Sequence, residues 1–202
     1  MCFLTENVIY STALHTVRFA LIFYHAPASL PMDTLVWLSW LPYNLFFTGR
    51  DDPRNHCLIG EDVVPRFFLF ETPERQLKTT VYSNNSSKVA LLFFGSGKQL
   101  GSATIGSRVV PMTDLLSPGS QHNARAFCTS DGRRFEWRKA SPGEYDLYAL
   151  QPAAVRIAAF RRYSKTTPVG KSTGLLQYTF SQDDLLLYSI LALCLNRWID
   201  AM

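Results

Sequence analysis

The side chains that could carry out acid–base, nucleophilic or metal chemistry are few in this chain and widely separated. The histidines and cysteines stand at His15, His25, His56, His122, Cys2, Cys57, Cys128 and Cys194. No two cysteines form a C-x-x-C pair, and no two histidines have the H-x-x-x-H or H-E-x-x-H spacing of helical zinc sites. We therefore expect reduced thiols, histidines that lie at the surface or cap an element, and neither a metal nor a cofactor.

Sequence patterns typical of enzymes are also missing. There is no G-x-S-x-G motif for a serine nucleophile. The glycine-rich stretch Gly95–Gly106 lacks the spacing of a phosphate-binding loop, and Lys98 is not followed by Ser or Thr. We therefore expect no catalytic residue and a protein that is not an enzyme. The alternative is an enzyme with a dispersed active site. The residues that would then converge are His56, His122, Cys128 and Glu71.

Basic side chains are more concentrated than the other charged residues. Between Pro152 and Phe180 there is no acidic residue, and the basic residues there are Arg156, Arg161, Arg162, Lys165 and Lys171. Basic clusters near aromatic residues can bind anionic lipid headgroups or nucleic-acid phosphates. The competing interpretation is that these side chains keep strand faces soluble and sheet edges unpaired. This group is a candidate anionic-ligand surface, with lipid preferred because no RNP-type aromatic motif supports RNA binding.

The elements that must position these residues are mostly strands. The chain is 47% hydrophobic, 13% aromatic and carries a formal net charge of +4, which fits a strand-rich globular protein. From Gly49 onward, turn signals separate short runs typical of strands. The predicted strands are Arg66–Glu71, Lys78–Ser83, Lys88–Phe94, Ser102–Ile105, Arg108–Met112, Ala124–Thr129, Arg134–Lys139, Tyr145–Gln151, Arg156–Tyr163 and Leu175–Phe180. This spacing indicates an antiparallel sandwich or barrel.

The end of the chain breaks this pattern with a predicted helix at residues 182–200. It begins at Ser181-Gln-Asp-Asp184, which is similar to a capping box, and Leu185–Leu195 is apolar except for Ser189. A membrane span needs about 20 apolar residues, so burial in protein is favoured. The economical arrangement is an antiparallel β-barrel of about 10–12 strands that encloses this hydrophobic C-terminal α-helix and so protects the sheet edges.

Residues 1–47 differ from the predicted barrel domain, residues 48–202. Their only charged residues are Glu6, Arg18 and Asp33, and their apolar runs are short or interrupted by proline. An apolar extension packed on the domain, a membrane-associated segment and a stretch outside the native protein are alternatives that remain open. The expected location is intracellular and cytoplasmic.

The stretch FCTSDGRRFEWRK reads as a hairpin with two alternative registers. A two-residue turn pairs Cys128 with Phe135, whereas a three-residue Ser-Asp-Gly loop with a left-handed Gly132 pairs Phe127 with Phe135. The second register is favoured, because it places glycine at the bulge. In both registers Phe135 and Trp137 face the helix. The side chains expected to point away are those of Arg134, Glu136 and Arg138.

Four stretches appear in an order and spacing typical of one family. They are DDPRN at 51–55, FETPERQLKTTVY at 70–82, FCTSDGRRFEWR at 127–138 and the closing apolar helix. Together they resemble a fungal domain-of-unknown-function family, the one numbered 6593. A barrel around a C-terminal hydrophobic helix is similar to the tubby-like architecture, which LURP-one-related and scramblase-type domains share. The resemblance implies a fold and carries over no functional residue.

These observations lead to an expected function of surface binding. We expect a non-enzymatic binding or scaffolding module that engages anionic phospholipid through the Arg156–Lys171 group, with peripheral membrane association. Another protein is the alternative partner, and nucleic acid is not expected. A membrane-anchored protein that inserts through residues 8–47 is the alternative function.

Overall fold

The computed structural model describes residues 43–61, 66–84, 86–96, 99–167 and 169–201 of the chain. These residues form one antiparallel sheet and a C-terminal helix, so the predicted mainly β class is confirmed. The predicted N-terminal extension lies outside the described residues except for residues 43–47, which belong to the first strand, β1. In the described part of the chain, no helix is long and apolar enough to cross a membrane.

The strands are short because closely spaced turns interrupt the alternation of apolar and polar residues. They are β1 (Tyr43–Asp52), β2 (Asn55–Gly60), β3 (Phe67–Glu71), β4 (Lys78–Ser83), β5 (Ser87–Phe93), β6 (Ser102–Ile105), β7 (Arg108–Pro111), β8 (Ser117–Pro118), β9 (Ala124–Cys128), β10 (Arg134–Ser141), β11 (Glu144–Ala149), β12 (Val155–Thr167) and β13 (Gly170–Tyr178). A 3-10 helix, η2 (Met112–Leu115), separates β7 from β8, and the α-helix α2 (Asp183–Asp200) follows β13.

Strands that are neighbours in the sheet are also neighbours in the chain, with one exception. The order is β7-β6-β5-β4-β3-β2-β1-β13-β12-β11-β10-β9-β8. The exception is the pairing of β1 with β13, in which Tyr43 lies opposite Tyr178 and Leu45 opposite Leu176. This antiparallel pair joins the first and last described strands in the middle of the sheet.

The sheet is open, which differs from the expected closed barrel of about 10–12 strands. It has 13 strands, and its two end strands, β7 and β8, are not paired with each other. Proline stands on both sides of the break: β7 ends at Pro111, and β8 consists only of Ser117 and Pro118. Because proline has no N–H to donate, Pro111 and Pro118 each remove one donor from the strands at the break. The chain crosses the break as η2, which buries Met112 and Leu115.

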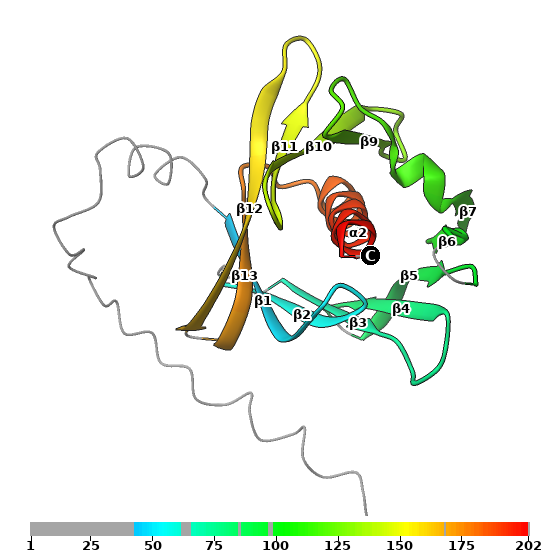
Figure 1. The fold of residues 1–202 in the computed structure, drawn as a ribbon, viewed down its shortest axis with the longest axis vertical. Helices are drawn as coiled ribbons and strands as arrows, with labels where there is room; N and C mark the ends of the chain where they lie inside the picture. Colours follow the sequence, from blue (N-terminus) through cyan, green and yellow to red (C-terminus); the bar gives the residue numbers. More distant parts are fainter. Residues whose placement is uncertain (1–42, 62–65, 85, 97–98, 168, 202) are drawn as a thin grey trace, which may run out of the picture. The chain divides into compact units, whose positions relative to one another are not determined.

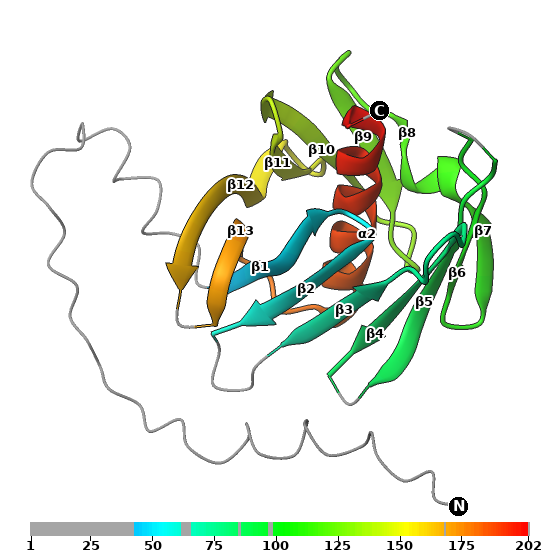
Figure 2. The ribbon, with the colours of Figure 1, turned by 60° about the horizontal axis from the view of Figure 1, so that its bottom comes forward.

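Helix α2 packs against the inner face of the curved sheet, as the view along the helix in Figure 1 and the turned view in Figure 2 show. All residues from Leu185 to Leu195 except Leu187 are buried. The indole Nε1 of Trp137 on β10 donates a hydrogen bond of 3.0 Å to the backbone oxygen of Ser189. The prediction that this helix is buried in protein is therefore confirmed. Its apolar surface forms the core together with the inward side chains of the strands.

The start of α2 does not use the predicted capping box. The N-cap residue is Gln182, and no side chain caps it. The carboxylate of Asp183 instead pairs with Arg66 at 3.1 Å, and that of Asp184 accepts a hydrogen bond of 2.7 Å from the Ser130 hydroxyl. The two acidic side chains still suit the positive end of the helix, but they connect it to the sheet and its loops.

The β9–β10 hairpin adopts the favoured three-residue register. Phe127 lies opposite Phe135, the two rings stack with centroids 5.8 Å apart, and Gly132 has a φ of 82°. Asp131 accepts hydrogen bonds from Thr129 and Arg133 inside the loop. Asp131 therefore stabilises the turn of this hairpin.

Glu136 points away from α2, as expected, but it is fully buried. The loop after β8 covers it, and Ser120 donates to its carboxylate from the backbone nitrogen at 2.8 Å and from the hydroxyl at 2.6 Å. Arg138 adds an ion pair of 2.6 Å. Burial acts to raise the pKa of Glu136, but these hydrogen bonds and the Arg138 charge outweigh it and lower the pKa.

Candidate functional site

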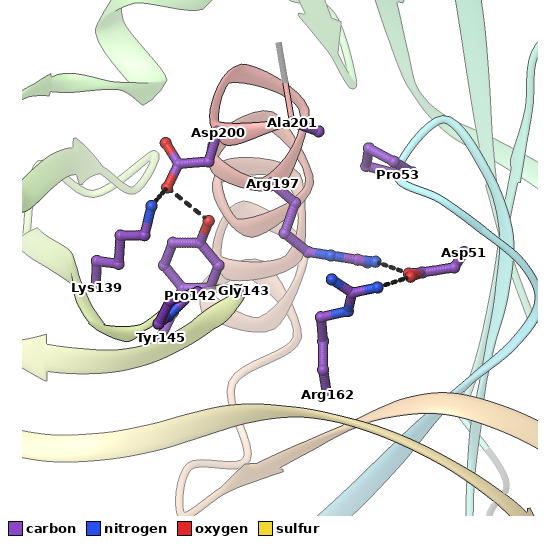
Figure 3. Close-up of a pocket in the computed structure, with 10 residues that line it drawn as sticks. All are labelled: Asp51, Pro53, Lys139, Pro142, Gly143, Tyr145, Arg162, Arg197, Asp200 and Ala201. Carbon is purple, nitrogen blue, oxygen red and sulfur yellow. Dashed lines mark hydrogen bonds and ion pairs between the residues drawn. The ribbon is translucent and has the colours of Figure 1, made fainter.

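A pocket of about 320 Å³ lies at the C-terminal end of α2, and we call it the α2-end pocket. Its lining residues are Asp51, Pro53, Lys139, Pro142, Gly143, Tyr145, Arg162, Arg197, Asp200 and Ala201. They come from the end of β1 and the turn after it, from β10, β11 and the turn between them, from β12, and from α2 and the residue after it (Figure 3). The pairing of β1 with β13 and of β13 with β12 brings Asp51 near Arg162.

One wall of the pocket is a carboxylate shared by two guanidinium groups. Arg197 donates from Nη2 to Asp51 at 2.6 Å, and Arg162 donates to the other oxygen of the same carboxylate. Arg197 also lies against the rings of Phe47 and Phe160, 5.3 and 4.9 Å from their centroids. This aromatic packing holds the guanidinium of Arg197 in place, because cations are attracted to ring faces.

The other wall is built on Asp200 in the last turn of α2. Lys139 pairs with its carboxylate at 2.8 Å, Arg125 donates to it at 2.9 Å, and the Tyr145 hydroxyl donates to it at 2.9 Å. Partial burial acts to raise the pKa of Asp200, but the hydrogen bonds from Lys139, Arg125 and Tyr145 outweigh it and lower the pKa. Burial and the Asp200 carboxylate together raise the pKa of Tyr145, so its hydroxyl stays protonated as a donor.

The pocket offers hydrogen-bond donors rather than acceptors. Both carboxylates already accept from two or three donors. Arg197 is only 8% exposed, and its Nη1 is buried with no hydrogen-bond partner among the described residues. In Figure 3 only one end of the Arg162 guanidinium is joined to Asp51. The arrangement can therefore accept an anionic group.

A second polar cluster lies behind this pocket, in the core. The His56 ring is stacked between Phe47 and Phe70, and its Nδ1 lies 2.9 Å from the backbone oxygen of Asp52. A carbonyl can only accept, so Nδ1 carries the proton and Nε2 accepts from the thiol of Cys194, 3.5 Å away.

Burial dominates the titration of this pair. Burial, followed by the positive charge of Arg197, lowers the pKa of His56 to about 3. Burial raises the pKa of the Cys194 thiol to about 12. The imidazole is therefore neutral and the thiol protonated near neutral pH. The prediction that Cys194 is a small core residue is confirmed. Of the two positions expected for His56, the surface is wrong, whereas its hydrogen bond to the Asp52 carbonyl at the end of β1 is a capping contact.

The five residues of the predicted anionic-ligand surface do not form one surface. Arg156 and Arg161 reach the Asp146 carboxylate on β11, at 3.7 and 2.7 Å. Arg162, the next residue along β12, enters the α2-end pocket. The remaining two are Lys165 and Lys171 near the end of the β12–β13 hairpin; both are exposed.

Within the described part of the chain, no hydrogen bond, ion pair or ring contact brings together the residues named for a dispersed active site. His56 is buried, whereas His122, Cys128 and Glu71 are exposed on three different segments. Among the described residues, no group of three or more His, Cys, Asp or Glu side chains could hold a metal ion. Cys2, His15 and His25 lie outside the described residues.

A larger hollow of about 660 Å³ lies beside the β9–β10 hairpin. Two arginines line it, but Arg133 pairs with Asp131 at 2.7 Å, and Arg134 donates to the backbone oxygen of Pro118 at 2.9 Å. None of its lining residues combines burial with an unused donor, as Arg197 does. We therefore prefer the smaller α2-end pocket as the candidate site.

Sequence reasoning missed most members of the candidate site, although weak signals were present. Arg197 and Asp200 are three residues apart at the end of the predicted helix, so they lie on one face of it. Asp51 stands in the DDPRN stretch. Lys139 and Tyr145 flank the Ser-Pro-Gly turn, which marks a hairpin without indicating a site.

The comparisons with known proteins assign a family without assigning an activity. Among curated proteins and among solved structures, none matches the chain significantly. The profile of the DUF6593 family, a family of unknown function, matches residues 51–193, which is more than two thirds of the chain. That range includes β2 to β13 and most of α2, with Asp51, Lys139, Tyr145 and Arg162 of the pocket. The chain therefore belongs to the DUF6593 family.

Proposed function

We propose that the protein is a non-enzymatic, cytoplasmic binding module that contacts anionic phospholipid through the end of the β12–β13 hairpin. The supporting observation concerns Lys165 and Lys171. Both are exposed, and neither has a carboxylate partner among the described residues. We call this pair the hairpin lysines. Arg156, Arg161 and Arg162 each face a carboxylate. Of the predicted basic surface, only the hairpin lysines therefore remain available to an anionic lipid.

The position of the hairpin lysines favours contact with a flat anionic surface. Lys171 lies opposite Thr166 at the end of the hairpin, and Lys165 lies opposite Ser172. Arg50 is exposed near the end of β1, the strand that pairs with β13. It therefore adds a third positive charge at the same end of these strands as the hairpin lysines. Each such residue near an anionic membrane contributes about 1 kcal/mol, so the three support weak, reversible and salt-sensitive binding.

Two features favour a binding role over an enzymatic one. His56 and Cys194 are buried in the core, and His122, Cys128 and Glu71 lie apart from them.

In this proposal the curved sheet around α2 is a tubby-like barrel that is open between β7 and β8. Membrane insertion through residues 8–47, which lie outside the described residues, is the alternative, and release of the protein by carbonate extraction would exclude it.

Sedimentation with vesicles tests the lipid proposal. We expect the protein to bind acidic vesicles of phosphatidylserine and phosphatidylcholine, and to be released by salt, because surface charge is screened within about 8 Å at physiological ionic strength. The double variant Lys165→Glu, Lys171→Glu should lose this binding. The matched control is Lys78→Glu, Lys88→Glu, which reverses two exposed lysines on β4 and β5. Equal binding to neutral vesicles, or an equal loss in both double variants, would contradict the proposal.

A further inference from the structure

We propose that the α2-end pocket is a binding site for the phosphate group of a small phosphorylated molecule, held by Arg162 and Arg197. This site is separate from the hairpin lysines and does not depend on their contact with lipid. Its residues come from β1, β12 and α2, so the site exists only in the folded sheet.

The first argument is charge. Three cationic side chains line the pocket, those of Lys139, Arg162 and Arg197, and Arg125, which does not line it, also pairs with Asp200. These four are paired with only two carboxylates, those of Asp51 and Asp200. Two formal positive charges therefore remain without a counter-ion in these two networks. The C-terminal end of α2 contributes a partial charge of only about −0.5, which is too small to cancel them.

The second argument is the supply of hydrogen-bond donors. Asp200 accepts from three side chains, and Asp51 accepts from both arginines, so neither carboxylate can satisfy a further donor easily. The guanidinium Nη1 of Arg197 is buried without a partner among the described residues. That nitrogen is closed to a ligand, so the donors available to an oxyanion in the pocket belong to the partly exposed side chains of Arg162 and Lys139.

The third argument is the exposure of the two arginines. The Arg197 side chain is 8% exposed and held by the rings of Phe47 and Phe160, whereas the Arg162 side chain is 55% exposed. One guanidinium is thus preorganised and the other can turn toward a ligand. The two guanidinium groups converge on the Asp51 carboxylate, so a phosphate would bind beside this carboxylate or displace it. Guanidinium N–H groups match phosphate oxygens in pairs.

A phosphate monoester fits the pocket better than a carboxylate does. At neutral pH it carries a charge of about −1.5 to −2, which matches the two uncompensated positive charges, whereas a carboxylate carries one negative charge. The volume of about 320 Å³ leaves room for a small organic group beside the phosphate. Ligand pockets usually begin at about 300 Å³, so the expected ligand is small.

Titration followed by ¹H–¹⁵N NMR tests this site in the full chain. The probes are inorganic phosphate, glycerol 3-phosphate, glycerol, and vesicles of phosphatidylcholine with or without phosphatidic acid. We expect saturable shifts at Gly143, Tyr145 and Asp200 with glycerol 3-phosphate and none with glycerol. Arg162→Gln should raise the Kd at least tenfold, because it removes a charge-assisted contact from an exposed position. The control Arg134→Gln, in the hollow beside the β9–β10 hairpin, should leave the Kd unchanged.

In a second variant, the Kd for phosphate should change in the opposite direction. Asp51→Asn removes the carboxylate that competes for both arginines, so phosphate should bind more tightly, with a lower Kd. A purely structural role of Asp51 would instead weaken binding together with thermal stability, and that result would count against the site.

The experiments with vesicles show whether the bound phosphate belongs to a soluble molecule or to a lipid headgroup. Binding to phosphatidic acid vesicles without binding to the soluble probes, with a loss in Arg162→Gln, would support the site with a lipid as its ligand. A loss only in Lys165→Glu, Lys171→Glu would assign lipid to the hairpin lysines and overturn the pocket as a lipid site. Absence of saturable binding of every probe at millimolar concentration, or equal affinity in Arg162→Gln, would overturn the proposal.

Discussion

The thiol of Cys194 on α2 lies 3.5 Å from Nε2 of His56 on β2, so a hydrogen bond links the helix to the sheet inside an apolar core. Phe47 and Phe70 cover the two faces of the imidazole ring. Because Nδ1 donates to the Asp52 carbonyl, every polar atom of this histidine has a partner. The contact is structural.

Stability should fall with acidification in a window set by His56. Its pKa is lowered to about 3 in the folded protein, whereas an unfolded histidine titrates near about 6.5. Between these values the unfolded state binds a proton that the folded state does not, so the free energy of unfolding decreases as the pH falls below about 6.5. Each pKa unit corresponds to about 1.4 kcal/mol, so the full loss amounts to several kcal/mol.

Urea unfolding at pH 7, 6 and 5 measures this loss. The carboxyls with lowered pKa, Asp131, Glu136 and Asp200, lose their contribution only at lower pH, because unfolded carboxyls titrate near about 4. His56→Phe should remove most of the slope between pH 6.5 and 5, while His122→Phe, at an exposed position, should retain it. A wild-type stability that is constant over this window would contradict the prediction.

The described cysteines should differ sharply in their reactivity toward iodoacetamide. Cys128 is exposed, Cys57 is partly buried, and Cys194 is buried with a pKa raised to about 12. Alkylation requires the thiolate and access to it, so the expected order in the native protein is Cys128, then Cys57, with Cys194 unmodified. Mass spectrometry of peptides after timed alkylation gives the order. Rapid labelling of Cys194 before unfolding would show that the core opens easily.

Glu136 should contribute strongly to stability through the loop that covers it. Glu136→Gln removes the charge that Ser120 and Arg138 bind and places an amide against their donors. The expected loss is about 3 kcal/mol, at the lower end for a broken buried ion pair because Arg138 keeps some exposure to water. Glu144→Gln, a partly exposed carboxylate on β11, should cost under about 1 kcal/mol. Urea midpoints of the two variants compare them directly.

Gly143 should matter both for stability and for the position of Arg162. Its φ is +78°, and a Cβ added there would lie 2.7 Å from Cδ of Arg162. Gly143→Ala should cost about 1–2 kcal/mol from the left-handed backbone alone, and it should also move Arg162 away from Asp51. Gly132→Ala is the matched control, since its φ is +82° with open space around the added atom. Equal thermal destabilisation and equal phosphate affinity in both variants would show that the Arg162 contact is unimportant.

The features that the sequence predicts well are those with local causes. The Ser-Asp-Gly loop specifies its register because glycine supplies the positive φ of the bulge, and the register of Phe127 with Phe135 is confirmed. The apolar run Leu185–Leu195 identifies a helix buried on almost every side. Its predicted range of 182–200 agrees closely with α2.

The features that were missed depend on contacts between distant segments. The α2-end pocket joins residue 51, the 139–145 turn, residue 162 and residues 197–200, and no local pattern relates these positions. Asp184 looked like a capping residue, but it binds Ser130, which is 54 positions away. His56 shares the inward face of β2 with Leu58, but no strand was predicted at residues 55–60, so the period of two that explains its burial was not recognised.

The pairing of β1 with β13 also has a consequence for how the chain is made. Of the described elements, β13 and α2 emerge last from the ribosome, so during synthesis β1 has an unpaired edge and the inner face of the sheet is uncovered. Contacts such as Tyr43 with Tyr178 close a loop of more than a hundred residues, and such long-range pairing is slow to form. The nascent chain therefore passes through a stage that is open to aggregation, and the arrival of α2 ends this stage.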